Sequence, residues 1–207
     1  MNTLILMANS KLPKALTLAF GMAILSLLGS TIPAAIIGVT PVHAQADQRY
    51  SSNELVNAGH GFFGAAASGL ATVIEKAVEE HGLPNGYILG EEASGALVAG
   101  LRYGEGALYT KNAGDHPVFW QGPSIGWDYG GDGNRTMMLV YNLTNTEKIY
   151  RRFYGVSGSA YLVGGIGMTV MKHGDTVLVP VRAGIGARLG VNVGYLKLRE
   201  TPTWNPF

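Results

Sequence analysis

The sequence contains no cysteine and few charged side chains. None of the 207 residues is cysteine, which excludes disulfides, thiol chemistry, cysteine-based zinc sites, iron–sulfur clusters and the lipid-bearing cysteine of lipoproteins. Charged residues make up 14% of the chain and the net charge is +1, whereas a nucleic-acid-binding protein needs a clear excess of lysine and arginine. The hydrophobic fraction of 47% argues against disorder, so a hydrophobic core must stabilise the fold.

The first 44 residues have the pattern of a secretory signal peptide. Lysines precede an uncharged apolar run from Ala15 to Ile32, and Val42-His43-Ala44 forms a small-x-small cleavage site before Gln45. The apolar run is also long enough to cross a bilayer as an uncleaved anchor. We favour cleavage because Pro33 interrupts the segment. In either case the remainder of the chain is exported.

The segment from Ser51 to His81 predicts helical structure. A serine can cap its start, and Gly82 and Pro84 end it. Glycines weaken its first half, so we expect a short helix or loop before a stronger helix that begins near residues 64–68. The apolar residues spaced by three and four are Phe62, Phe63, Ala66, Leu70, Val73, Ile74, Ala77 and Val78.

The rest of the chain predicts β-structure. Turn-forming residues separate segments rich in Val, Ile, Leu and Tyr, and no second long helical period appears. A parallel βαβ architecture is therefore disfavoured. The predicted strands lie near residues 87–90, 95–110, 117–121, 135–143, 148–154, 158–172 and 176–199.

Two long segments place glycine on one face only. Leu97, Ala99, Leu101, Tyr103, Ala107 and Tyr109 alternate with Gly100, Arg102, Gly104 and Gly106, and residues 181–195 repeat the pattern. Such strands can coil sharply, and closure into a barrel removes exposed strand edges. We therefore predict a mainly β fold: a small antiparallel β-barrel over residues 87–207, with an N-terminal α-helical segment over residues 45–86 packed on it as one domain. The helix should cover an end of the barrel or its glycine-lined face.

Specific motifs are distributed over residues 52–207. They are Gly90-Glu91-Glu92, Gly100-Leu101-Arg102-Tyr103-Gly104-Glu105-Gly106, Trp120-Gln121-Gly122-Pro123-Ser124-Ile125-Gly126, Leu139-Val140-Tyr141-Asn142-Leu143, Gly155-Val156-Ser157-Gly158-Ser159-Ala160-Tyr161, Pro180-Val181-Arg182 and Asn205-Pro206-Phe207. Together they resemble the EipA family, which is named for cell-envelope integrity. The resemblance implies a periplasmic protein of double-membrane bacteria, a small β-barrel with an N-terminal helix, a part in envelope integrity and stress resistance, and no established catalytic activity.

Three arginines on the glycine-bearing faces are candidates for ligand contact. Arg102, Arg182 and Arg188 are not crowded by neighbouring side chains and can bind a carboxylate or phosphate with both arms of the guanidinium. We favour a structural network in which they pair with Glu91, Glu105, Asp128 or Asp132. The alternative is contact with an anionic headgroup or polyanion of the envelope. The candidate ligand-binding residues, aromatic platform included, are Arg102, Tyr103, Trp120, Gln121, Trp127, Arg182, Arg188 and Asn192.

Other motifs suggest chemistry only weakly. Ser124 lies in a G-x-S-x-G pattern, but the nucleophile elbow needs a strand before the serine and a helix after it. His116 and His173 stand in glycine or proline turn contexts, where we expect solvated loop histidines. A calcium loop at Asp128, Asp132 and Asn134 lacks the EF-hand spacing and tandem repeats, so we favour a hairpin turn. We predict no metal and no cofactor.

Three functions remain. We favour a non-enzymatic periplasmic barrel that binds an envelope lipid, lipopolysaccharide, peptidoglycan or a periplasmic protein, and that is not an integral membrane protein once processed. The second is an outer-membrane β-barrel, which alternating strands and the terminal Phe207 suggest but Pro202 and Pro206 oppose. The third is a hydrolase of envelope polymer that uses Ser124, or the Asp128 and Asp132 pair.

Overall fold

Residues 44–207 form one compact unit of the chain. The structure, a computed structural model, describes residues 47–64, 68–95, 99–125, 134–183 and 194–205. Residues 1–44, which the sequence predicts to be a signal peptide, lie outside the described residues. The elements are α1 (Ser52–Phe63), α2 (Leu70–His81), β1 (Gly86–Gly95), β2 (Ala99–Thr110), β3 (Gly114–Ile125), β4 (Asn134–Tyr141), a 3-10 helix η2 (Thr146–Ile149), β5 (Arg152–Gly155), β6 (Tyr161–Val163), β7 (Ile166–Met168), β8 (Met171–His173), β9 (Thr176–Ala183) and β10 (Tyr195–Arg199).

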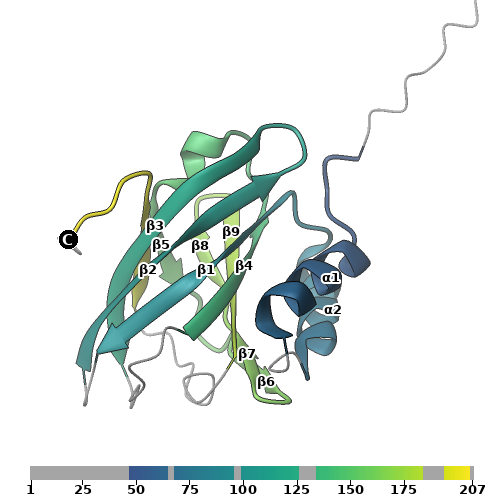
Figure 1. Ribbon diagram of the computed structural model, residues 1–207, viewed down its shortest axis with the longest axis horizontal. Helices are drawn as coiled ribbons and strands as arrows, with labels where there is room; N and C mark the ends of the chain where they lie inside the picture. The colour runs from purple at the N-terminus through teal and green to yellow at the C-terminus, as the bar shows by residue number, and fades with distance from the viewer. Residues whose placement is uncertain (1–46, 65–67, 96–98, 126–133, 184–193, 206–207) are drawn as a thin grey trace, which may run out of the picture. The chain divides into compact units, whose positions relative to one another are not determined.

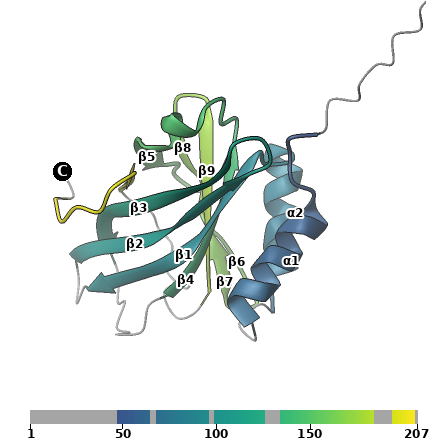
Figure 2. The same ribbon diagram turned by 45° about the horizontal axis from the view of Figure 1, so that its top comes forward.

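Eight of the strands form a closed antiparallel barrel (Figures 1 and 2). Their order is β4-β1-β2-β3-β10-β5-β8-β9, and the pairing of β4 with β9 closes the ring. Strands β7 and β8 both pair with the same edge of β9, one after the other. Strand β6 pairs with β7 in a short hairpin. The predicted antiparallel barrel with an N-terminal helical segment is confirmed.

The two helices arise from the signals seen in the sequence. Ser51 caps α1 by accepting a hydrogen bond from the backbone N–H of Glu54, whose side chain accepts one from the backbone N–H of Ser51. Gly64 ends α1 with a φ of 60°, and Gly82 ends α2 with a φ of 77°, a conformation that side chains other than glycine rarely adopt. The expected interruption of the helical segment therefore falls between α1 and α2.

Alternation along the strands divides the apolar residues between two cores. In β1, β4, β9 and β10, even-numbered residues face the barrel interior, and odd-numbered residues of β1, β4 and β9 face outward. The inner core consists of Ile88, Leu108, Val118, Trp120, Met138, Val140, Leu143, Ile149, Phe153, Met171, Leu178, Leu196 and Leu198. The outer core joins Leu55, Phe63, Leu70, Val73, Ile74 and Ala77 of the helices to Met137, Leu139, Tyr141, Ile166, Met168, Val170, Val177, Val179 and Val181 of the barrel wall.

The prediction that the helix covers an end or the glycine-lined face was wrong. The helices pack on the aliphatic outer face of β4, β9 and β7, because the apolar stripe of a helix needs apolar surface to bury. The glycine face of β2 points inward, where Gly104 and Gly90 make room for the indole of Trp120. A Cβ atom at Gly104 would overlap that ring. Glycine therefore admits a large side chain into a narrow barrel.

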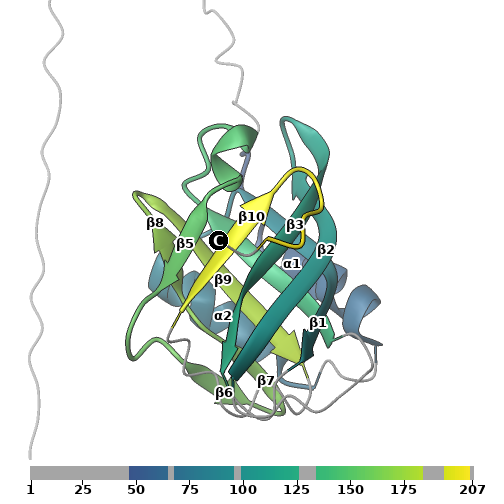
Figure 3. The ribbon, with the colours of Figure 1, turned by 90° about the vertical axis from the view of Figure 1, so that its left-hand side faces the viewer.

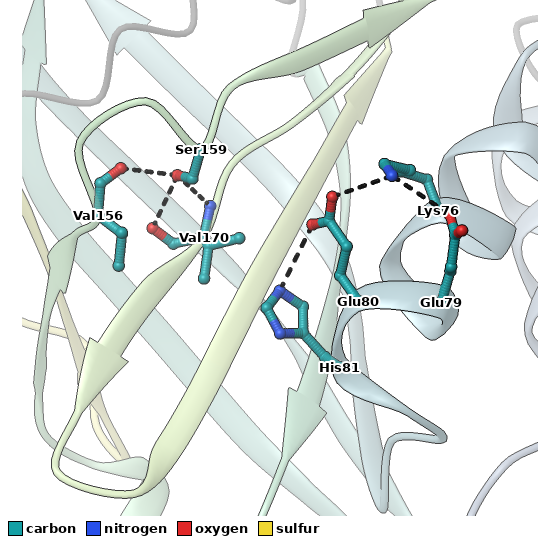
Figure 4. Close-up of polar contacts among 7 residues, drawn as sticks. All are labelled: Lys76, Glu79, Glu80, His81, Val156, Ser159 and Val170. Atoms are coloured by element: carbon teal, nitrogen blue, oxygen red, sulfur yellow. Dashed lines mark hydrogen bonds and ion pairs between the residues drawn. The ribbon is translucent and has the colours of Figure 1, made fainter.

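Two of the predicted strands are broken in the structure. Residues 158–172 form three short strands, because Gly164 and Gly165 take positive φ angles of 56° and 77° in the turn between β6 and β7. Residues 146–149 form η2 rather than strand. Ser159 holds the connection after β5: its hydroxyl accepts from the N–H of Val170 at 3.0 Å and donates to the carbonyl of Val156 at 2.7 Å (Figure 4).

Candidate functional site

A buried ion pair lies inside the barrel. Arg182 approaches Glu92 with Nε 3.1 Å from Oε1 and Nη2 3.2 Å from Oε2, and Trp120 donates from Nε1 to Oε2 at 2.8 Å. Glu92 is 6% exposed. Burial alone would raise the pKa of Glu92, but Arg182, Arg102 and Trp120 outweigh it and hold the pKa below its ordinary value.

Arg102 also points into the barrel and binds backbone. Its Nε and Nη2 both donate to the carbonyl of Pro123, at 2.9 and 2.8 Å. Arg182 therefore forms a structural ion pair, as expected for the arginines, but with Glu92 and not with Glu91 or Glu105. Trp120 is 1% exposed, so it supports the interior of the barrel rather than an aromatic platform on the surface.

Tyr103 and Gln121 lie on the outer wall, where they hold the end of the chain. We call residues 200–205 the C-terminal strap. Tyr103 donates from its hydroxyl to the carbonyl of Trp204 at 3.0 Å, and the Gln121 amide donates to the carbonyl of Asn205 at 2.7 Å. The strap therefore crosses β2 and β3 on the outside of the barrel (Figure 3).

Several candidate residues fall outside the described part of the chain. Trp127, Asp128 and Asp132 lie in residues 126–133, and Arg188 and Asn192 lie in residues 184–193. Within the described ranges, no group of three or more His, Cys, Asp or Glu side chains is placed to hold a metal ion. The helices of the described ranges are also too short or too polar to span a membrane.

The residues considered for catalysis lie in strands. Ser124 belongs to β3, where its register partner is Gly100 of β2. His116 is also in β3 and its Nε2 lies 3.0 Å from the carbonyl of Ala113, while Nδ1 of His173 in β8 lies 2.9 Å from the carbonyl of Arg152. His173 is exposed, as expected, and lies at the end of β8 directly before a turn, whereas His116 is half-buried; both lie in strands and not in loops as expected.

A cluster of charged and polar side chains lies at the C-terminal end of α2. Lys76 lies 3.2 Å from both Glu79 and Glu80, and Nε2 of His81 lies 3.9 Å from Glu80 (Figure 4). Burial lowers the pKa of His81, whose ring packs edge-on against Tyr141. The ion pairs lie within α2, and the contact of the His81 ring with Tyr141 joins the end of this helix to the barrel wall.

A basic groove on the outer wall was not predicted from the sequence. We use this name for the groove of about 480 Å³ over β5 and β10. Its cations come from two distant parts of the chain that the pairing of β5 with β10 joins, with Lys197 directly opposite Arg152. The groove is lined by Tyr150, Arg151, Arg152, Tyr154, Lys197, Leu198, Arg199, Glu200 and Thr201.

The electrostatics of the basic groove favour an anion. Four cations face a single carboxylate, Glu200, and like charges directly opposite on neighbouring strands repel each other. Partial burial, then Arg199 and Arg152, lower the pKa of Lys197. Nε of Arg199 is buried and has no hydrogen-bond partner among the described residues. The residues that line the groove therefore carry a net positive charge.

One sequence signal pointed to this groove. Lys197 and Arg199 alternate with Leu196 and Leu198, which places both cations on the face opposite the apolar residues. The sequence could not show that Arg151 and Arg152 lie beside them, because that neighbourhood depends on pairing between distant strands.

Comparison with known proteins places the chain in a family. The family model of envelope integrity protein A, EipA, matches residues 48–207. The chain belongs to the EipA family. The crystal structure of a β-barrel-like, uncharacterized protein from Brucella abortus is 62% identical in sequence, with a TM-score of 0.72 over 77% of this chain and 99% of that one. No match is found among curated proteins.

The EipA family name assigns the chain a role in envelope integrity. It states a cellular property and leaves the molecular contact to be derived from the structure.

Proposed function

We propose that this EipA-family protein is a non-enzymatic periplasmic protein that supports envelope integrity by binding an anionic envelope component in the basic groove. The observation that carries the proposal is the set of four cations around one groove with a single carboxylate. Guanidinium and ammonium groups bind phosphate or carboxylate oxygens through charge-assisted hydrogen bonds. Tyr150 and Tyr154 add aromatic surface at the rim.

The distribution of polar and apolar residues supports a barrel that works in an aqueous compartment. An outer-membrane barrel carries an apolar band outside and a polar interior. In this barrel the interior holds Leu, Ile, Val, Met, Phe and Trp side chains, two helices cover the aliphatic outer face, and the opposite wall carries the groove. Figure 3 views that wall, with β10 between β5 and β3 and the helices behind.

The filled interior also supports binding on the outside. Trp120 and the Glu92–Arg182 pair occupy the space that the glycine face opens. A ligand that entered the barrel there would have to displace a buried ion pair, whose separation leaves an uncompensated charge. The outer wall requires no such rearrangement.

The experiment measures co-sedimentation of the protein in the form that the cell produces. The materials are vesicles of phosphatidylcholine alone or mixed with phosphatidylglycerol, lipopolysaccharide, and purified peptidoglycan. The shared chemistry is an oxyanion, and the separate arms identify its source. We expect binding to one anionic material that weakens steeply with added salt, because exposed charges are screened beyond about 8 Å at physiological ionic strength.

The test variant is Arg152→Gln with Lys197→Gln. It removes two cations that repel each other and also the contact of the Arg152 guanidinium with the Tyr195 ring, at 4.4 Å from the ring centroid, so the free energy of unfolding should change by less than about 1 kcal/mol. Affinity should fall by about tenfold or more, the effect of losing one charge-assisted hydrogen bond. The control is Lys76→Gln, which removes one cation from α2 on the helix side of the barrel. Unchanged binding in the double variant, or equal losses in the control, would refute the proposal.

A further inference from the structure

A second cavity lies on the outer wall beneath the C-terminal strap. We call it the strap pocket; its volume is about 440 Å³, within the range usual for small-molecule sites. Residues of β1, β2 and β3 form its base, and these include the inward-facing Glu92, Gly104 and Trp120 as well as outward-facing residues. Pro202, Thr203 and Trp204 form a side. The hydrogen bonds from Tyr103 and Gln121 to strap carbonyls hold that side in place.

Aromatic rings line the strap pocket. Tyr103 and Phe119 rise from neighbouring strands, and the Tyr103 ring lies 5.3 Å from the Trp204 ring at an interplanar angle of 57°. Trp204 is 85% exposed. The hydrogen bond from Tyr103 to its carbonyl holds Trp204 beside the cavity, where its exposed indole is accessible to a ligand.

Two exposed carboxylates border the same pocket. Glu91 and Glu105 are direct register partners on β1 and β2, both are exposed, and neither forms an ion pair within the described part of the chain. Like charges in this position destabilise a sheet. The other register neighbour of Glu91 is Arg135, which donates instead to the carbonyl of Phe62 at 2.7 Å and lies over the Phe62 ring.

The nearest cation of the basic groove does not remove this negative potential. Arg199 is the register partner of Phe119, which in turn neighbours Glu105. Two strand spacings separate Arg199 from Glu105 along this row, about 10 Å, which is close to one screening length in physiological salt. The outer wall is therefore acidic and aromatic over β1 and β2 but basic over β10 and β5.

We propose that the strap pocket binds an alkylammonium group. A π-face attracts a cation, and carboxylates beside it add Coulomb attraction that a neutral ligand cannot use. A neutral sugar ring could stack on Trp204 but would leave the repulsion between Glu91 and Glu105 in place. The site is separate from the basic groove, so this inference stands independently of the proposed function.

The test compares choline with 3,3-dimethylbutan-1-ol, which replaces the quaternary nitrogen by carbon and removes the charge. Binding to the full processed protein is followed by ligand-observed NMR and calorimetry. We expect choline to bind at least about tenfold more tightly than its neutral isostere, because only the cation engages the π-faces and carboxylates. Ethanolamine distinguishes a primary from a quaternary ammonium.

Variants locate the effect. Trp204→Leu and Glu105→Gln should each weaken choline binding by about threefold to tenfold, whereas Glu75→Gln, an exposed carboxylate on α2, should change it by less than about twofold. Glu105→Gln also removes a repulsion, so its folding stability should not fall. Arg152→Gln with Lys197→Gln should retain choline binding, which separates failure of this inference from failure of the basic groove.

Two results would overturn the inference. One is equal binding of choline and the neutral isostere. The other is binding of N-acetylglucosamine that survives Glu105→Gln but not Trp204→Leu, which would make the pocket a sugar-stacking site.

Discussion

Removal of Arg182 should turn the buried carboxylate of Glu92 from a stabilising group into a destabilising one. In the wild-type protein the pKa of Glu92 is held below its ordinary value, so its contribution to stability is present above the unfolded pKa and is lost only as the pH falls through the lower folded value. In Arg182→Met, burial opposes the charge with less compensation, and we expect the pKa to rise.

The size of the effect follows from the proton that the folded variant can take up. The ordinary pKa of Glu92 is 4.5, so holding the carboxyl protonated in the folded state costs about 3.4 kcal/mol at pH 7 and about 0.8 kcal/mol at pH 5. These are upper limits on the charge penalty at each pH. The limit at pH 7 agrees with the loss of about 3–5 kcal/mol that is typical when one partner of a buried ion pair is removed. A loss of this size is about half of the stability of a small domain.

The assay is urea unfolding of wild type and Arg182→Met at pH 5 and pH 7, followed by tryptophan fluorescence. We expect the variant's deficit in unfolding free energy to grow by about 2 kcal/mol between pH 5 and pH 7, with a similar urea dependence in both proteins. When Glu92→Gln is combined with Arg182→Met, the new amide carries no charge but its oxygen can still accept from Trp120, so the pH dependence should disappear. A deficit that is the same at both pH values would refute the assignment of Glu92 as a buried, paired carboxylate.

Three further predictions concern packing, helix capping and the dependence of stability on pH. Gly104→Ala should lower the free energy of unfolding by about 1–3 kcal/mol because the new methyl group meets the indole over that position, whereas Gly61→Ala in α1, where a Cβ meets nothing, should raise it by about 0.5–1 kcal/mol; equal urea midpoints would contradict this. Ser51→Ala should cost about 1 kcal/mol by removing the cap of α1. Hydrogen bonds from Lys111 and Ser51 lower the pKa of Glu54 to about 2. The stabilisation that this carboxylate provides is therefore complete above pH 4.5 and is lost as the pH falls toward 2. In Glu54→Gln, the free energy of unfolding should fall less steeply over this pH range in an acid titration.

Local signals in the sequence determined the helices well. The cap at Ser51, the stop at Gly82 and the apolar spacing of Val73, Ile74 and Ala77 depend on residues within a few positions of one another. The glycine-bearing strands likewise predicted a barrel. The inward face could not be assigned, because an alternating pattern fixes two faces of a strand and not which of them meets the helices.

The candidate site was harder to predict, because it depends on distant pairings. Arg182 was recognised as a cation on a glycine face, but its partner Glu92 lies in another strand and became identifiable only from the closed barrel. The basic groove depends on β5 lying beside β10, which brings Arg152 opposite Lys197. Composition gave no indication of either site, since the positive and negative charges of the chain nearly cancel.

The position of β10 has a consequence for how the chain acquires its structure. This last strand fills the gap between β3 and β5, both of which are made much earlier in the sequence. Until Tyr195–Arg199 emerges, those two strands present unsatisfied ladder edges, which are templates for association with other chains. Barrel closure must therefore wait until β10 has been made, and a chain that lacks this strand exposes edges that favour aggregation.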